Sequence, residues 1–402
     1  MVRLHTRQGR DGKGDGRMKV LQVIDSFSYG GAERLLATLN GVAGEVGLEL
    51  TAASMAPYSE ERTASLPLLA GAGLRPSFIG ARKMVLDRHA LPLVRRAIAA
   101  SGCDVVHAHL GTSAFLVPIA ARQLGVPCVS TLHHVPTRRL RDRPRRELLK
   151  EWLWTRSAER GAALIYVSDA ARRAAAELVG PARPTWRVLH NGIDLSRLLP
   201  HDEADRPPLP ADLPIADGAP VVTIVAALRP LKGHEVALRA WPWVRAAFPD
   251  AVLLIVGDGP HAAALRAAAG EGVVFAGSRE DVPEILRGST LALLPSFTEA
   301  LPTAMIEAAG SGLAAVATTV GGTPETVEHG ETGLLVPPGD VQALADAVIT
   351  LLADPVRRGE YGRAARKLAE ERFDVRRWAQ ELEKLYRESV RGHRGLRKAK
   401  SR

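Results

Sequence analysis

The segment LALLPSFTEALPTAMIE, residues 291–307, joins an apolar run to a stretch of helical period. The run predicts a strand buried on both faces of a parallel sheet, and Pro302 suits the first turn of the helix that follows. Glu299 is therefore expected in the loop beyond the strand, and Glu307 about one and a half turns into the helix. A carboxylate accepts two hydroxyl hydrogen bonds, so both glutamates suit the vicinal hydroxyls of a ribose or hexose. The spacing alone is a weak signal, because glutamate pairs of this kind are common.

The same alternation of a short β-branched run with an Ala-, Leu- and Arg-rich stretch recurs along the whole chain. Such alternation predicts βαβ units and a doubly wound parallel sheet. Two series of runs predict an α/β protein in which two Rossmann-like doubly wound sheets face each other across a cleft. The runs expected as strands are residues 20–24, 48–53, 104–107, 127–131, 163–167 and 187–190 in the first half, and 221–226, 252–257, 273–275, 291–295, 314–318 and 333–336 in the second.

The segment HDEADRPPLP, residues 201–210, is polar and Pro-rich, which is typical of an inter-domain linker. Residues 1–17 are either a disordered extension or the product of a misassigned start, because Met18 opens a strand-like run. The predicted division is a disordered basic tail over 1–17, an N-terminal Rossmann-like domain over 18–205, a C-terminal Rossmann-like domain over 206–375, a helix over 376–390 that crosses back to the N-terminal domain, and a basic tail over 391–402.

The positive charge is concentrated at the two ends of the chain. Of 402 residues, 53 are Lys or Arg and 44 are Asp or Glu, which gives a net charge of +9. Residues 1–17 hold five basic and two acidic groups, and residues 391–402 hold six basic and no acidic groups, so the tails account for the whole excess. This argues against a nucleic-acid partner, because the basic charge of such proteins lies on the folded body. The tails fit attraction to an anionic membrane surface, or no function at all.

Cys103 and Cys128 form no CxxC pair and are too few for a zinc site, which favours a reducing compartment. No apolar run approaches the ~20 residues that span a bilayer, and the N-terminus lacks the apolar core of a signal peptide. We therefore expect a cytoplasmic protein, with peripheral contact to the inner face of the membrane through its basic segments.

Two further loops follow expected strands and offer backbone amides or cations. Gly31 lies in a Gly-Gly pair before a helix, where backbone amides can approach an anion; a tight turn is the alternative. Arg229 and Lys232 follow the first expected strand of the second half, where the two cations can hold a diphosphate. Two solvated surface cations are the alternative there.

Four histidines lie near the ends of two successive expected strands: His107 and His109 at one, His133 and His134 at the next. We interpret one or two of them as hydrogen-bonding groups of a pocket; core or surface histidines and a metal site are the alternatives. No HExxH or DxD pattern is present, so no metal is expected. The charge-dense segment 138–146 is either a solvated loop or a contact for an anionic acceptor or a membrane.

The order of these motifs resembles that of the retaining glycosyltransferases of family four, which have the two-domain GT-B fold. The resemblance runs from about Met18 to Tyr386 and is more specific in the second half, since the first half binds differing acceptors in this family. The motifs that carry it are GGAER at 30–34, HAH at 107–109, VLHNGID at 188–194, KG at 232–233, VGDGP at 256–260, the two glutamates, GGTPE at 321–325 and GLLVPPGD at 333–340.

The resemblance implies that the second half binds the donor and the first half the acceptor. Glu307 is expected to bind the ribose hydroxyls, Glu299 hydroxyls of the transferred sugar, and Lys232 the phosphates. His109 is similar to the family's pocket histidine near the reacting bond, so His109 and Glu299 are the expected catalytic residues. The other expected donor-binding residues are Gly31, Arg229, Leu301, Thr303 and Ala304, and the expected acceptor-binding residues are His133, Arg138 and Arg139.

Three positions depart from the family pattern. Ala227 stands where the family usually has an arginine; residues two apart in an extended chain share a face, so Arg229 is expected to supply the guanidinium. Ala300 and Leu301 replace a common Gly-Phe pair, which alters the fit around the donor sugar. The histidine pair 133–134 replaces a histidine followed by a small polar residue.

The implied activity is that of an enzyme, a retaining and metal-independent glycosyltransferase. It moves a hexose from a nucleotide sugar, expected to be UDP-linked, to an envelope glycan or lipid-linked acceptor, without a cofactor. The expected partners are that donor, that acceptor and an anionic membrane surface. The alternatives are a sugar-nucleotide epimerase on the same fold and a non-catalytic sugar-nucleotide-binding protein.

Overall fold

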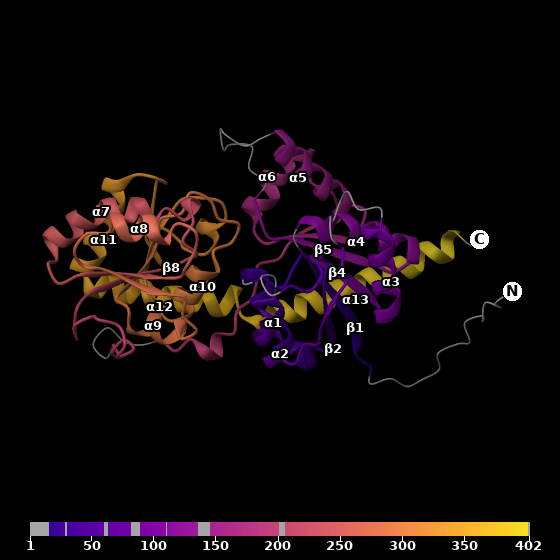
Figure 1. Ribbon diagram of the computed structural model, residues 1–402, viewed down its shortest axis with the longest axis horizontal. Helices are drawn as coiled ribbons and strands as arrows, with labels where there is room; N and C mark the ends of the chain where they lie inside the picture. Colours follow the sequence, from indigo (N-terminus) through magenta and orange to yellow (C-terminus); the bar gives the residue numbers. More distant parts are fainter. Residues whose placement is uncertain are drawn as a thin grey trace.

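The protein has two domains, and each is built around one parallel sheet (Figure 1). The computed structural model describes residues 16–28, 30–59, 63–81, 89–109, 111–135, 145–200 and 206–400. The first sheet runs in the order β3 (Pro76–Phe78), β2 (Leu48–Ser54), β1 (Met18–Ile24), β4 (Val105–His109), β5 (Cys128–Leu132), β6 (Ala163–Tyr166) and β7 (Trp186–Val188). The second runs in the order β10 (Val273–Gly277), β9 (Val252–Val256), β8 (Val221–Val225), β11 (Leu291–Leu294), β12 (Ala315–Thr318) and β13 (Gly333–Val336).

Helices cover both faces of each sheet because the strands are apolar on both faces. In β1, Val20 and Ile24 belong to one buried cluster, whereas Leu21 and Val23 belong to the cluster on the opposite face. The helices of the first domain are α1 (Gly31–Ala43), α2 (Leu66–Gly71), α3 (Ala90–Ser101), α4 (Gly111–Leu124), α5 (Arg145–Ala158) and α6 (Asp169–Val179). Those after the second sheet begins are α7 (His234–Ala247), α8 (Ala262–Ala268), α9 (Val282–Gly288), α10 (Thr303–Gly310), α11 (Val341–Ala353), α12 (Pro355–Arg372) and α13 (Val375–Lys400).

The two-sheet architecture predicted from the sequence is confirmed, and all six runs expected in the second half are strands. The first sheet has one strand more than expected, the edge strand β3. It is three residues long and begins with Pro76, so neither its length nor its composition distinguishes it from a loop.

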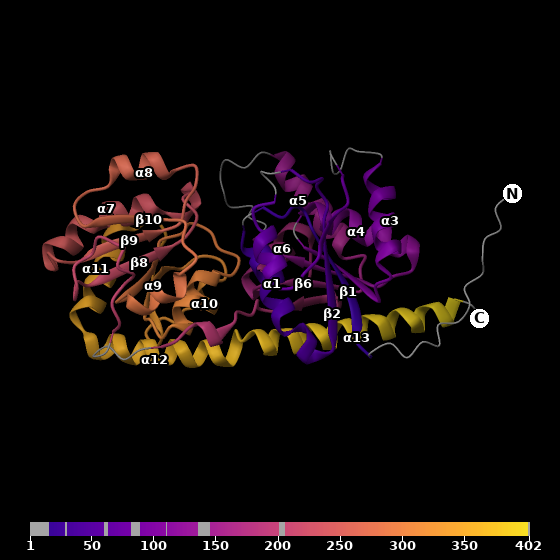
Figure 2. The same cartoon turned by 60° about the horizontal axis from the view of Figure 1, so that its bottom comes forward.

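Helix α13 returns from the second domain to the first (Figure 2). Its residues Trp378, Leu382 and Tyr386 are buried in the same cluster as Leu36 of α1. Where the chain crosses between domains, Ile193 donates its amide to the carbonyl of Phe373 at 2.8 Å. The helix begins close to the residue expected but continues to Lys400, through most of the segment expected as a basic tail, and residues 1–15 lie outside the described residues.

A Cβ at Gly192 would lie 2.7 Å from the Cβ of Trp378, so this crossing leaves no room for a side chain there. Among the described residues, no helix is long and apolar enough to cross a bilayer.

Candidate functional site

The loops after β8 and β11 bring a lysine and a glutamate into contact. These strands are neighbours in the second sheet, so their carboxyl ends share one edge. Nζ of Lys232 donates to Oε1 of Glu299 at 2.7 Å, and Oγ of Ser296 donates to the same oxygen at 2.7 Å. The side chain of Glu299 is 8% exposed and that of Lys232 is 30% exposed, so the pair opens to solvent on the lysine side. The structure thus joins two of the residues expected at the donor.

A glycine fixes the approach of these two loops. Gly233 has φ +69°, and a Cβ built there would lie 1.9 Å from the carbonyl oxygen of Pro295. Beside it, the amide of Phe297 donates to the carbonyl of Leu231 at 2.8 Å. Lys232 therefore reaches Glu299 because the backbones of the two loops are in direct contact.

Two further glycines, in the loop after β12, lie against the backbone of Glu299 and Ala300. A Cβ at Gly321 would lie 1.7 Å from the carbonyl oxygen of Glu299, and one at Gly322 would lie 2.1 Å from that of Ala300. The sequence analysis gave residues 321–325 as a family motif and predicted no such contact. The loop after β12 thus holds the backbone that carries Glu299.

Helix α10 begins directly after the β11 loop that carries Glu299 and has no side-chain cap at its N-terminus. Its first residues, Thr303 and Ala304, are half-buried, and their amides lie at the positive end of the helix. Leu301 is 7% exposed and packs in an apolar cluster with Ile193 and Phe373, so its side chain lies in the crossing between domains. The helix start is therefore available to an anion, whereas the Leu301 side chain supports the domain junction.

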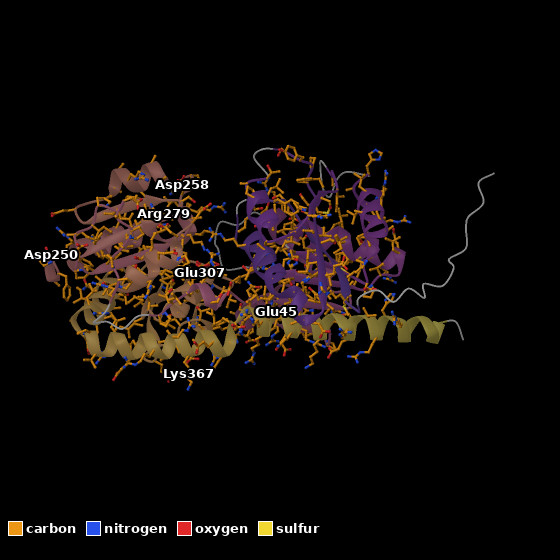
Figure 3. All side chains as sticks on the ribbon, turned by 90° about the horizontal axis from the view of Figure 1, so that it is seen from below. Glu45, Asp250, Asp258, Arg279, Glu307 and Lys367 are labelled. Carbon is orange, nitrogen blue, oxygen red and sulfur yellow. The ribbon has the colours of Figure 1, made fainter. Side chains whose placement is uncertain are left out.

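Glu307, half-buried in α10, lies on the side of the second domain that faces the first domain (Figure 3). Burial raises the pKa of its carboxyl, and the nearby cations Arg34 and Arg197 oppose that rise. Arg34 belongs to α1 in the first domain, so the field at this carboxylate comes from both domains. Within the described part of the chain, the carboxylate has no hydrogen-bond partner, which leaves it free to accept two hydroxyls.

The start of α1 lies in the first domain, after β1. Gly31 is exposed, and a Cβ there would meet nothing within 4 Å. Glu33 folds back so closely that a Cβ at Gly30 would lie 2.7 Å from its Oε2, and burial raises the pKa of Glu33 to about 7. Asp25 accepts the amides of Thr112 and Ser113 at the start of α4, at 3.1 and 2.7 Å. The carboxylates near β1 thus occupy two helix starts.

His109 is 4% exposed at the carboxyl end of β4, and both of its ring nitrogens are engaged. Its Nδ1 lies 3.0 Å from Nε2 of His133, and its Nε2 lies 2.7 Å from Oε1 of Gln22. His133, its partner, is half-buried. In this arrangement His109 contacts substrate only by giving up one of these bonds, so its catalytic role stays a prediction.

The remaining expected residues are not brought into this group. Arg229 is exposed at the start of the turn η5 (Pro230–Lys232), with no ion-pair partner among the described residues. Arg138 and Arg139 lie outside the described residues. The residues that the structure describes contain no group of three His, Cys, Asp or Glu side chains that could hold a metal ion; the metal-free reaction stays a prediction.

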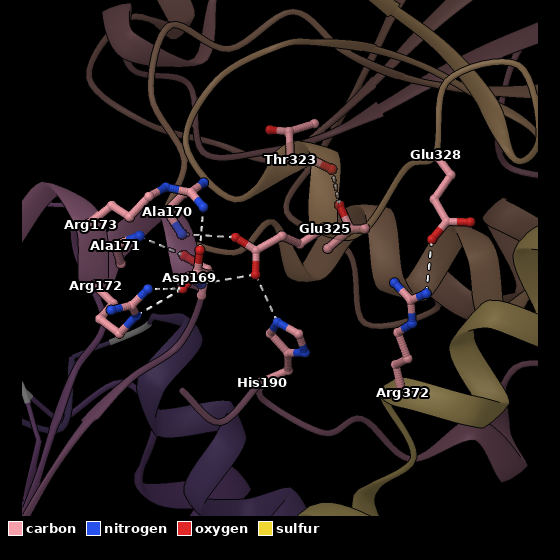
Figure 4. Close-up of polar contacts among 12 residues, drawn as sticks. Asp169, Ala170, Ala171, Arg172, Arg173, His190, Thr323, Glu325, Glu328 and Arg372 are labelled. Carbon is pink, nitrogen blue, oxygen red and sulfur yellow. Dashed lines mark hydrogen bonds and ion pairs between the residues drawn. The ribbon is translucent and has the colours of Figure 1, made fainter. Parts of the chain in front are cut away.

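A carboxylate that sequence reasoning left without a role joins the two domains (Figure 4). Glu325, in the second domain, accepts the amides of Asp169 and Ala170 at the start of α6, at 2.9 and 3.0 Å. It also lies 2.9 Å from Nε2 of His190. Although partial burial raises its pKa, these hydrogen bonds outweigh burial and leave the pKa of Glu325 lowered. It lies in the motif at 321–325, which was the available signal.

Gln22 and Tyr386 were also missed. Gln22 is fully buried in β1, and Tyr386 is fully buried in α13. A polar residue inside the apolar run of residues 20–24 was a usable signal for the first. The second had none, because its partner His107 is 279 residues away.

Two family models match the chain. The model described as Glycosyltransferase Family 4 matches residues 29–197, and the model described as Glycosyl transferases group 1 matches residues 219–354. The alpha-maltose-1-phosphate synthase of Mycolicibacterium smegmatis is 31% identical over 326 residues, which cover 74% of this chain and 81% of the relative. A GDP-mannose-dependent monoacylated alpha-(1-6)-phosphatidylinositol monomannoside mannosyltransferase of Corynebacterium glutamicum is 35% identical over 215 residues. That match covers 50% of this chain and 56% of the mannosyltransferase, so it spans about half of each.

Solved structures share the fold. HepE of Anabaena, determined with UDP and glucose, superposes with a TM-score of 0.77 at 23% identity, covering 91% of this chain and 98% of that one. The sucrose-phosphate synthase of Thermosynechococcus elongatus superposes with a TM-score of 0.75 at 22% identity, covering 92% and 98%.

Proposed function

This chain belongs to the group 1 glycosyl transferases of glycosyltransferase family 4, and on that premise we propose that it transfers a hexose from a UDP-linked sugar to a glycan or lipid acceptor of the cell envelope. In this proposal the anomeric configuration is retained and no metal or cofactor takes part. The name of the mannosyltransferase relative, which acts on a phosphatidylinositol mannoside, supports a lipid-linked acceptor.

The observation that carries the proposal is the Lys232–Glu299 pair next to the uncapped start of α10. A sugar diphosphate presents anionic phosphates beside vicinal hydroxyls. A lysine and free helix amides suit the phosphates, and a carboxylate suits the hydroxyls. In this proposal Glu307, on the same helix as those amides, accepts the ribose hydroxyls. These chemistries meet at one edge of the second sheet, where ligands of doubly wound folds bind.

In the proposed reaction, the bond between the anomeric carbon and the diphosphate oxygen breaks while the acceptor hydroxyl attacks from the same face. The acceptor oxygen bonds to that carbon, and its proton passes to a diphosphate oxygen. Negative charge grows on the departing diphosphate, where Lys232 and the amides of Thr303 and Ala304 would stabilise it. Arg229, exposed near the same turn, would add its charge if it turns toward the phosphates.

We propose helix α5 as the surface that contacts the membrane. Leu149, Trp152 and Leu153 are 58%, 39% and 36% exposed, and their spacing places them on one side of the helix. Arg146 and Lys150 flank them and are exposed. Apolar side chains among basic ones suit an anionic bilayer surface. The test is sedimentation with phosphatidylglycerol vesicles, in which the double variant Leu149→Ser, Leu153→Ser is expected to bind less than wild type. Unchanged binding of this variant would contradict membrane contact through α5. Loss of binding on truncation after residue 390 would instead assign the contact to the C-terminal tail.

The donor site is tested by thermal unfolding with UDP, GDP and ADP, without metal and then with Mg²⁺. A ligand at about 100 times its Kd stabilises the folded state by about 2.7 kcal/mol. The expected result is a shift with one nucleotide that Glu307→Ala abolishes. Glu331→Ala is the matched control, since Glu331 is exposed on the second domain and belongs to no part of the site. No shift with any nucleotide would contradict the proposal.

The reaction is tested with the nucleotide sugar that the binding experiment selects. Proton NMR of the product distinguishes retention from inversion at the anomeric carbon. Exchange of the C2 hydrogen of the donor with D₂O would indicate an epimerase instead. Binding without turnover on any acceptor glycan or lipid would indicate a binding protein.

A further inference from the structure

A series of hydrogen bonds runs through the first domain from Thr131 in β5 to Tyr386 in α13, and from there to His133 at the carboxyl edge of the first sheet. Oγ1 of Thr131 lies 2.7 Å from Nε2 of His107, whose Nδ1 lies 2.6 Å from the hydroxyl of Tyr386. Nε2 of Gln22 donates to that hydroxyl at 3.4 Å, and Oε1 of Gln22 lies 2.7 Å from Nε2 of His109. The chain ends at the next pair, Nδ1 of His109 and Nε2 of His133, 3.0 Å apart. Apart from half-buried His133, every member is buried.

The three histidines in this series of hydrogen bonds are neutral, so each ring carries one proton. Burial lowers the pKa of His107 to about 3 and that of His133 to about 4, and it places the pKa of His109 well below its ordinary value. Each neutral ring has one donor nitrogen and one acceptor nitrogen. His109 and His133 are bonded ring to ring, so fixing the proton on one of these two rings fixes it on the other.

The amide of Gln22 sets the direction. Its Oε1 can only accept, so Nε2 of His109 carries the proton and donates to it. Nδ1 of His109 is then an acceptor, which requires Nε2 of His133 to donate. On the other side, Tyr386 accepts from Gln22 and donates to Nδ1 of His107, and Nε2 of His107 donates to Thr131. One consistent direction thus covers all five bonds.

We infer that Tyr386 and Gln22 are positioning residues that hold His133 in the tautomer with a bare Nδ1, so that this nitrogen accepts a hydrogen bond from a substrate hydroxyl. Nδ1 of His133 has no partner among the described residues, and His133 follows β5 at the carboxyl edge of the first sheet. The inference rests on the proposed function for the identity of that hydroxyl, which belongs to the sugar or to the acceptor.

This assignment gives helix α13 a role at the site besides packing. Among the described residues, the hydroxyl of Tyr386 makes the hydrogen-bond connection between His107 and the group formed by Gln22, His109 and His133. Phenylalanine at this position keeps the ring that packs against α1 but removes the link. Gln22 then loses the bond that orients its amide, and both amide orientations become accessible.

The decisive measurement is the tautomer of each histidine, read by long-range ¹H–¹⁵N NMR of the full-length protein without ligand, with signals assigned by His133→Asn and His109→Asn. The expected result is a proton on Nε2 of His107, His109 and His133. In Tyr386→Phe, His109 and His133 should show a mixture of tautomers, whereas Tyr361→Phe, in α12, should not change them. A proton on Nδ1 of His133, or unchanged tautomers in Tyr386→Phe, overturns the inference.

Kinetics then separate positioning from folding. With the donor and acceptor found above, Tyr386→Phe should lower kcat about tenfold, as expected for one net hydrogen bond, and leave the KM of the donor unchanged. Gln22→Met, of similar volume, should do the same if Tyr386→Phe does not fold. Wild-type kcat in both variants overturns the inference. Because the tautomers are read without substrate, failure of the proposed transfer is seen separately.

Discussion

Replacing Glu325 removes a contact that the second domain makes with the first. This carboxylate accepts two amides at the start of α6 and lies 2.9 Å from Nε2 of His190. Hydrogen bonds to a charged group contribute about 1.5–3 kcal/mol each when buried. The Glu325 side chain is 20% exposed, so solvent weakens each bond. We expect Glu325→Ala to lower the free energy of unfolding by about 2–4 kcal/mol.

Glu325→Gln should cost less, about 1–2 kcal/mol, because the amide keeps one acceptor oxygen of similar geometry. The variants are compared by calorimetry at pH 7, with Glu331→Gln as the matched control because Glu331 is exposed and has no ion pair among the described residues. Small-angle X-ray scattering of the same samples reports whether the domains move apart. A loss below about 0.5 kcal/mol with Glu325→Ala, equal to the control, would refute this account of the junction.

The contact also predicts a pH dependence of known sign. The pKa of Glu325 is lowered in the folded protein, from 4.5. Its stabilising contribution is therefore fully present above the unfolded pKa and disappears as the pH falls through the lower folded pKa. The difference in melting temperature between wild type and Glu325→Gln should shrink as the pH is lowered from 4.5 toward about 3.5. A difference that is constant over this range would show that the charge of Glu325 is not the stabilising feature.

Three further predictions concern the carboxyl edge of the second sheet, where the donor is proposed to bind; this edge is called the donor edge below. Gly233→Ala should separate Lys232 from Glu299, because a Cβ would meet Pro295, and should destabilise the protein by more than left-handed strain alone, which costs about 1–2 kcal/mol. Gly277→Ala, with φ +70° and open space around it, should show only that strain, and equal losses of the two variants in urea unfolding would contradict this. Lys232→Met should weaken nucleotide diphosphate binding at least tenfold by calorimetric titration, and Lys367→Met on α12 should not, since Lys367 is 77% exposed; equal affinities contradict the phosphate role. Because the pKa of Glu307 is raised, the affinity for nucleotide should fall as the pH falls through that pKa. The affinity of Glu307→Gln should not change over the same pH range, and parallel pH profiles of the two proteins would contradict the ribose role.

The sequence was sufficient for the donor edge because its residues follow strands that are adjacent in the sheet. Lys232 and Glu299 are 67 residues apart, yet each comes directly after a strand of apolar composition, and the carboxyl ends of parallel strands lie together. The sequence could therefore place each residue after a strand of the second sheet, but it predicted neither the order of the strands nor this contact. The glycines that bring the two loops into backbone contact could not be anticipated either, because their close neighbours become visible only in three dimensions.

The first domain was less predictable for a physical reason. Its polar groups are satisfied by one another across long sequence distances, as with His107 and Tyr386. Composition suggested a pocket role for the histidines, but burial decides which nitrogen stays available. Of the histidines at 107, 109 and 133, only the last keeps an unengaged ring nitrogen within the described residues. Arg138 and Arg139, the expected acceptor-binding residues, lie outside them.

The junction between the domains combines an apolar pivot with polar contacts at its rim. Phe373, Ile193 and Leu301 form one buried cluster where the chain crosses twice. Around it lie the hydrogen bonds of Glu325 and the opposed charges of Arg34 and Glu307. Burial of this apolar area stabilises the junction at any pH, whereas the hydrogen bonds of Glu325 add a contribution that depends on the charge of its carboxylate. The apolar cluster is therefore expected to keep the domains in contact when Glu325 is protonated or replaced. Only Pro302 separates Leu301 from the start of α10, so an anion bound at that start would lie next to this cluster and would be expected to stabilise the junction with it.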